Sequence, residues 1–155
     1  QKLIFLLMII LINGCTLSDF EKKQNVNNFS FEIDTPNDKY NVYFKENLKR
    51  FFHINDNKTK FILKTNITFE STKTLSVSGQ NILKSTKARV NYQLTNKNTN
   101  VVVKSGSIYT FPALSSSSNS LYSQEKSIEH IKDRLTKSSA KSLYTRINLI
   151  LRRLN

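Results

Sequence analysis

Four stretches of the chain alternate apolar and polar side chains, which is the pattern of a β-strand with one buried face. Asparagine, proline, serine or glycine, the residues typical of turns, separate these stretches. The alternation predicts strands at residues 29–34, at Phe61–Phe69 with pairing that can continue through residues 75–77, at Ala88–Leu94 and at Val101–Phe111.

Two other stretches repeat apolar residues at three- and four-residue steps, the spacing of an amphipathic helix. The first, Lys39–His53, has an aromatic face and follows Asp38, a residue that can cap a helix N-terminus. We interpret this face as core packing rather than as an aromatic ligand cage, because the spacing is that of an ordinary buried helix face. The second stretch follows a serine-rich loop at residues 112–120 and runs from Leu121 to about Leu154.

The order of these elements is strand, helix, three strands, helix. Two helices on one face of a sheet would bury both apolar stripes, while the alternating strands keep a polar face outward. The sequence therefore predicts an α+β fold in which a four-stranded, mostly antiparallel sheet carries two helices packed on one face.

The N-terminal stretch has a different character. Lys2 precedes an unbroken apolar run from Leu3 to Ile12, which is too short to span a membrane but typical of a signal peptide. The following Asn13-Gly14-Cys15 resembles a bacterial lipobox, whose cysteine becomes a lipidated first residue. A buried strand, an ordinary signal peptide and a short anchor helix are the alternatives.

Cys15 is the single cysteine of the chain, and lipidation would explain a lone thiol in an exported protein. The residue after it is Thr16 rather than the aspartate that retains many bacterial lipoproteins at the inner membrane, which favours the outer membrane. The predicted organisation is a lipoprotein signal peptide at 1–14, a lipidated tether at 15–28 and a single α+β domain at 29–155.

The chain is strongly basic, with 24 lysines and arginines against 11 acidic residues and a formal net charge of +13. Such an excess indicates a polyanionic partner. The heavy use of lysine, asparagine and isoleucine is also what a low-GC genome produces, so part of the excess can be compositional.

Motifs for catalysis or metal binding are absent from the sequence. His53 and His130 have no cysteine, histidine or carboxylate at ligand spacing, and no nucleophile elbow or phosphate-binding loop occurs. Glu125, Glu129 and Asp133 recur every four residues, but basic neighbours make a solvated helix face the better interpretation. We therefore expect a protein that is not an enzyme and that needs no cofactor or metal.

The basic residues near the strands are the remaining candidates for binding. Lysine and arginine beside hydroxyls and strand edges could hold phosphates through charge-assisted hydrogen bonds. A solvated polar sheet face is the alternative for each of them. The candidates around the turn between the second and third predicted strands are Lys73, Lys84, Lys87 and Arg89. Lys97 and Lys104 lie in the hairpin formed by the third and fourth predicted strands.

This order of parts resembles the family of the lipopolysaccharide-assembly lipoprotein LptE (RlpB), of the alphaproteobacterial type. The family's usual layout has a V-x-Y-x-L strand, a turn, a glycine in the next strand, an aromatic residue near its end, and a long helix closing on I-x-x-x-L. Here the matching segments are 88–94 (ARVNYQL), 103–107 (VKSGS) with Tyr109, 122–126 (YSQEK) and the helix end at 143–151, together with Cys15.

The resemblance implies a lipid-anchored protein on the periplasmic side of the outer membrane. It implies a plug inside the β-barrel of LptD, help in assembling that barrel, and contact with lipopolysaccharide during transport. Basic residues at one end of the sheet bind lipid A phosphates in the family, and Lys84, Lys87 and Arg89, with Lys73 beside them, lie nearest that region here.

Two other classes of protein share part of this pattern. An auxiliary lipoprotein of a lipid-transport ABC system would have a similar lipid anchor and α+β make-up. A nucleic-acid-binding domain is suggested by charge alone, but its binding face should interleave aromatic and basic residues. Here the aromatic residues fall on predicted core faces, so we expect no nucleic acid partner.

Overall fold

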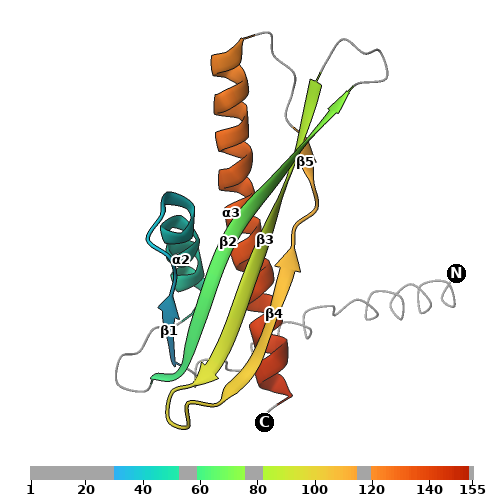
Figure 1. The fold of residues 1–155 in the computed structure, drawn as a ribbon. Helices are drawn as coiled ribbons and strands as arrows, with labels where there is room; N and C mark the ends of the chain where they lie inside the picture. The colour runs from blue at the N-terminus through green and yellow to red at the C-terminus, as the bar shows by residue number, and fades with distance from the viewer. Residues whose placement is uncertain (1–29, 53–58, 76–81, 115–119, 154–155) are drawn as a thin grey trace, which may run out of the picture.

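The computed structural model describes residues 30–52, 59–75, 82–114 and 120–153 (Figure 1). The predicted signal peptide at 1–14, the tether at 15–28 and the lipidation site Cys15 lie outside these residues, as does His53.

A twisted sheet forms one layer of the fold (Figure 1). Its order is β1-β2-β3-β4, and a very short β5 also pairs with β3. β1 runs parallel to β2, whereas the other pairings are antiparallel. The strands are β1 (Ser30–Asp34), β2 (Thr59–Leu75), β3 (Ile82–Asn96), β4 (Val102–Tyr109) and β5 (Ala113–Leu114).

The second layer consists of α2 (Lys39–Phe51) and α3 (Leu121–Arg152), which lie against the same face of the sheet (Figure 1). α2 begins after Asp38, whose carboxylate accepts hydrogen bonds from the backbone N–H groups of Tyr40 and Asn41. Because parallel neighbours need a crossover connection, α2 also carries the chain from β1 to β2.

The core lies between the two layers and follows the predicted alternation. β2 and β3 contribute alternate residues, and in the antiparallel register these stand opposite each other, as Leu63 does with Leu94. Around Phe31 the rings of Phe52 and Phe61 lie with centroids 4.4 and 6.0 Å away. The fully buried side chains of the core include Phe44 and Leu48 of α2, Leu63, Val90 and Leu94 of the sheet, and Leu143 and Ile147 of α3.

The small residues that interrupt the apolar stripe of α3 have a packing role. Thr136, Ser139 and Ala140 are fully buried. Their short side chains let the middle of the long helix approach the sheet closely, because a larger residue would hold the two layers apart.

The predicted fold class is confirmed: the structure is α+β, with a mostly antiparallel sheet and both helices on one face. Two features were not predicted, namely the parallel pairing of β1 and the short strand β5 inside the expected loop at 112–120. The hairpin of β2 and β3 is also longer than the apolar alternation indicates. It extends into a polar stretch because the backbone hydrogen bonds of a hairpin continue without apolar side chains.

Asn41 of α2 completes the edge of the sheet. The pairing of β1 with β2 ends at Lys64, so the next backbone groups of β2 need other partners. The backbone N–H of Ile67 donates to Asn41 Oδ1 at 2.8 Å, and Asn41 Nδ2 donates back to the carbonyl of Ile67 at 3.3 Å. The Asn41 side chain is buried and thus takes the place of a neighbouring strand.

We predict that Asn41→Leu destabilises the protein by about 1–3 kcal/mol, because it leaves both backbone groups of Ile67 buried without partners. The measurement is the free energy of unfolding in urea. Arg50→Leu, at an exposed position of the same helix, is the matched control and should change stability by less than about 0.5 kcal/mol. Equal stability of the Asn41→Leu variant and the wild type would contradict this role of the amide.

Candidate functional site

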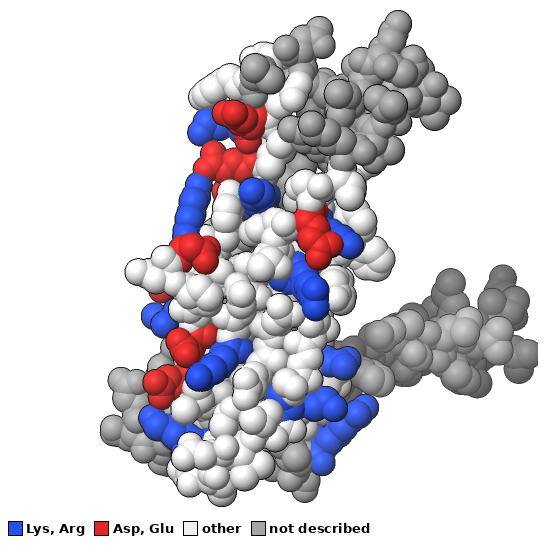
Figure 2. Space-filling view, viewed as in Figure 1, with Lys and Arg blue, Asp and Glu red and all other residues white. Residues whose placement is uncertain are grey.

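No described element covers the face of the sheet opposite the helices, here called the open face, and Figure 2 views the molecule from this side. Amides and hydroxyls occupy most of its middle, which appears as largely uncharged surface between scattered charges (Figure 2). The side chains on this face come from alternate positions: Lys64, Asn66, Thr68 and Glu70 of β2, Lys87, Arg89, Asn91 and Gln93 of β3, and Ser105, Ser107 and Tyr109 of β4.

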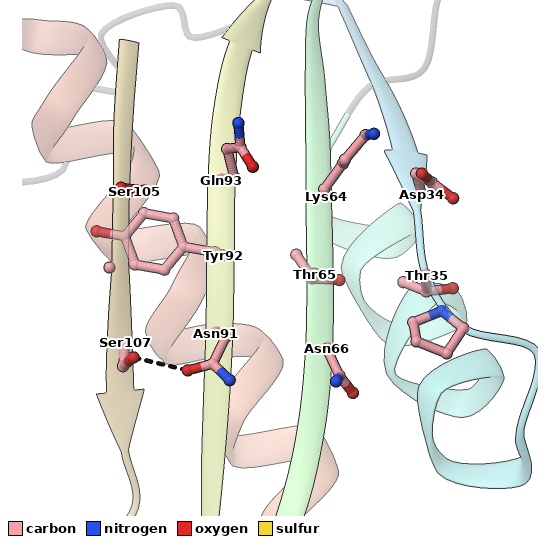
Figure 3. Close-up of a pocket in the computed structure, with 12 residues that line it drawn as sticks. Asp34, Thr35, Lys64, Thr65, Asn66, Asn91, Tyr92, Gln93, Ser105 and Ser107 are labelled. Atoms are coloured by element: carbon pink, nitrogen blue, oxygen red, sulfur yellow. Dashed lines mark hydrogen bonds between the residues drawn. The ribbon is translucent and has the colours of Figure 1, made fainter. Parts of the chain in front are cut away.

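A hollow of about 640 Å³ lies on this face. Its wall at one side is the end of β1 with Thr35 and Pro36, and its floor crosses β2 and β3 to Ser105–Ser107 of β4 (Figure 3). Short polar side chains create the depression, since large residues at these positions would fill it.

Packing against Tyr92 explains why residue 106 is a glycine. The Tyr92 ring extends from β3 toward β4 (Figure 3), and a Cβ atom at Gly106 would lie 3.2 Å from the tyrosine hydroxyl oxygen. Tyr92 is buried, so its ring has little room to move away. Glycine thus lets the tyrosine lie beside β4, in the cross-strand arrangement by which aromatic rings cover edge glycines.

Hydrogen bonds orient the polar groups of the hollow. Ser107 Oγ donates to Asn91 Oδ1 at 2.7 Å, the bond drawn in Figure 3. Asn66 Oδ1 accepts a hydrogen bond of 3.2 Å from Asn41 Nδ2, which links this amide to α2. The hollow therefore presents fixed amides and hydroxyls, the groups that would suit a hydrated polar surface or a polar ligand.

Two basic residues, Lys87 and Arg89, lie at the end of the open face that is nearest the turn of the β2–β3 hairpin. Lys87 Nζ lies 2.9 Å from the carboxylate of Glu70, its register partner. The hydrogen bond from Lys87, with its charge and that of Arg89, holds the pKa of Glu70 below its ordinary value. The Arg89 guanidinium lies over the Tyr109 ring, 5.5 Å from its centroid, in a cation–π contact.

The structure brings Lys87 and Arg89 together on the open face. Lys73 and Lys84 are register partners in the next part of the hairpin, but they belong to the alternate set of positions that includes Thr86. The side chains of Lys73 and Lys84 lie outside the described structure. Of the other candidates, Lys97 forms an ion pair with Glu32 at 3.0 Å.

Sequence reasoning missed Glu70 and Tyr109 as partners of the basic pair. Both occupy exposed positions of predicted strands, and their signal is the strand register, which places Glu70 opposite Lys87 and Tyr109 opposite Arg89. That register cannot be read from alternation, because a period of two does not say which residues face each other.

Of the acidic series on the last helix, Glu129 forms surface ion pairs. Glu129 accepts hydrogen bonds from Lys39 and Lys126, and the bond from Lys39 contributes most to lowering the pKa of Glu129. In the described ranges no three potential metal-ligating side chains lie together. Neither α2 nor α3 is long and apolar enough to cross a membrane.

No protein-family model and no curated protein sequence matches this chain. Solved structures do share its fold. The rare lipoprotein B of Shewanella oneidensis superposes with a TM-score of 0.61 at 10% identity, over 81% of this chain and 98% of that one. The minor lipoprotein of Acinetobacter baumannii gives 0.60 at 12% identity, over 83% and 94%. A Caulobacter crescentus protein classed as a lipoprotein gives 0.61 at 11%, over 81% and 92%.

At these identities the similarity is one of fold. The chain has the α+β architecture of several bacterial lipoproteins, and the agreement extends over nearly the whole of each of these three.

We predict that Lys87→Gln raises the pKa of Glu70 toward the ordinary value of a glutamate, because the variant removes the charge-assisted hydrogen bond and the positive charge of Lys87, while the charge of Arg89 remains. A carboxyl whose pKa is depressed by folding stabilises the protein above its unfolded pKa, and this contribution is lost as the pH falls through the folded pKa. The stability difference between wild type and variant should therefore shrink to zero in that acid range.

The measurement is an NMR titration of the Glu70 carboxyl carbon, combined with urea unfolding at several pH values. Lys141→Gln, at an exposed position of α3, is the control with the same change of charge and should leave Glu70 unaltered. An unchanged Glu70 titration in Lys87→Gln would show that the ion pair does not form in solution.

Proposed function

We propose that this protein is an outer-membrane lipoprotein of the LptE type, which plugs and helps assemble an LptD-type β-barrel and assists lipopolysaccharide transport. The observation that carries the proposal is the shared fold, which extends over 98% of the rare lipoprotein B of Shewanella oneidensis. The sequence resemblance at residues 88–151 to the LptE (RlpB) family supports the same assignment. The proposed role is one of binding and assembly, without catalysis.

The open face of the sheet is physically suited to the inside of a barrel. Large outer-membrane barrels have polar, hydrated interiors. The amides and hydroxyls of residues such as Asn91, Gln93 and Ser105 can form hydrogen bonds with water or with a barrel wall. Because these groups are uncharged, covering them leaves no unpaired charge buried.

Lipid attachment at Cys15 would hold the domain at the membrane. Each buried methylene of an acyl chain contributes about 0.8 kcal/mol, so two or three chains give a firm anchor. The proposed location is the periplasmic side of the outer membrane, with the tether at 15–28 joining the lipid to the domain.

The basic end of the hairpin is the proposed contact for lipopolysaccharide phosphates. Arg89 is held over Tyr109, and its Nε atom is buried without a hydrogen-bond partner in the described structure. A phosphate could accept hydrogen bonds from the outer guanidinium nitrogens, whereas Lys87 would have to exchange Glu70 for the phosphate. The register places Lys73 and Lys84 further along the same hairpin.

The first test of this function is affinity purification of the tagged protein from outer membranes in mild detergent. We expect an outer-membrane β-barrel protein to co-purify in a one-to-one ratio. A Cys15→Ser variant, which removes the proposed lipidation site, is expected to leave the membrane fraction. Recovery of ABC-transport components would favour the auxiliary lipoprotein instead, and recovery of no partner would reject the plug.

The second test addresses the phosphate contacts. We predict that replacing Lys84, Lys87 and Arg89 together by glutamate weakens lipopolysaccharide binding at least about tenfold, because one charge-assisted hydrogen bond contributes roughly 1.5–3 kcal/mol. Binding is measured in detergent with purified lipopolysaccharide, and circular dichroism checks that the domain stays folded.

The matched control replaces Lys45, Lys49 and Arg50 of α2 by glutamate, which changes the net charge equally on another element. If the control variant loses as much affinity as the hairpin variant, the attraction is a general effect of charge. Unchanged binding by the hairpin variant would reject these residues as the phosphate site.

A further inference from the structure

One edge of the sheet carries no neighbour in the described structure. β4 is the last strand of the order β1-β2-β3-β4 and pairs with β3 on one side only. At the other side of the sheet the edge strand is the five-residue β1, and where β1 ends Asn41 covers the next backbone groups of β2. In Figure 1 no described strand lies beyond the outer side of β4, and α3 passes behind β4 on the face that carries the helices.

The ladder with β3 shows which backbone groups of β4 point outward. The N–H of Thr110 donates to the carbonyl of Ala88 at 3.0 Å, and the N–H of Asn96 donates to the carbonyl of Val101 at 2.9 Å. Both bonds use even-numbered residues of β3. In an antiparallel ladder the bonded pairs alternate, so the backbone N–H and C=O groups of Ser105, Ser107 and Tyr109 face away from β3.

The open part of this edge has defined ends. A register irregularity opposite Leu94 and Thr95 marks its beginning, and Pro112, which has no N–H, follows its end. Bulges and prolines are devices that prevent strands from pairing at sheet edges. Between them lie Lys104–Tyr109, about 20 Å of strand. Ser105, Gly106 and Ser107 are exposed, and their small side chains do not shield the backbone.

We propose that this edge binds an extended, acidic segment of a partner protein, which adds to the sheet as a further strand beside β4. A row of N–H and C=O groups at every second residue is matched by another extended backbone, as in β-strand addition. The exposed side chain of Tyr109, at one end of this segment, would contact the added strand.

Charge selects the occupant. β4 contains Lys104 and no carboxylate, Arg89 lies over Tyr109 at its end, and Figure 2 shows basic but no acidic atoms over its lower part. A second copy of this chain is a poor partner, because pairing β4 with β4 joins two lysine-bearing strands of chains that each carry a net charge of +13. An acidic strand removes that repulsion. This interaction does not depend on the function proposed above, since it requires neither a barrel nor lipopolysaccharide.

The test uses the full chain, labelled with nitrogen-15, and a synthetic seven-residue peptide of alternating glutamate and valine. We expect slowed amide exchange at Ser105, Ser107 and Tyr109 on addition of the peptide. A peptide with lysine in place of glutamate should bind at least tenfold more weakly. So should a peptide whose alternate amides are N-methylated on the edge that faces β4.

Ser105→Pro removes one outward N–H without touching the bonds to β3, and we expect it to weaken peptide binding at least tenfold. Ser105→Ala keeps the N–H and is the matched control, which should bind as the wild type does. The β3–β4 amide spectrum checks that both variants keep the sheet.

Several results would overturn the proposal. These are no protection of the three amides at saturating peptide, protection at β2 instead of β4, equal binding of the lysine peptide or the methylated peptide, and equal affinities of Ser105→Pro and Ser105→Ala. Sedimentation at increasing chain concentration tests the alternative that a second copy of the chain binds at this edge. Protection of the same amides through self-association alone would also reject an acidic partner.

Discussion

The antiparallel pairing of β2 with β3 is the constraint on which the rest of the structure depends. Its register places Leu63 opposite Leu94 and Ile67 opposite Val90, so one face of the hairpin becomes largely apolar, with Thr65 as a buried polar exception. Such a face must be covered, and α2 and α3 cover it. The same register sends the intervening polar residues to the other face, which makes the open surface with its hollow a direct consequence of the core.

The two edges of the sheet are treated differently. On one side β1 pairs with β2 as far as Lys64, and the Asn41 amide then serves the backbone of Ile67. On the other side β4 keeps outward-facing backbone groups between a register irregularity and Pro112. The helix α2 thus supplies partners for the part of β2 that β1 does not reach, whereas the backbone groups on the outer side of β4 have no such cover among the described residues.

The surroundings of each basic side chain decide whether its charge is available to a partner. Lys87, Lys97 and Lys39 each contact a carboxylate, so their charges are partly balanced within the domain. Arg89 instead lies over an aromatic ring and beside an open surface. Net charge therefore indicates an anionic partner in general terms, while the pairing of individual residues decides where such a partner could bind.

The sequence by itself determined the elements, their order and the face of each strand, because side-chain alternation and helical spacing are local properties of the chain. It thereby predicted the α+β class and the open polar face. Only the tertiary structure decided that Glu70 stands opposite Lys87, that Asn41 replaces a strand beside Ile67, and that β4 ends the sheet. The physical reason is that a period of two specifies a face but not a register. Which residues meet across the strands is set by how the helices and the hairpin pack together.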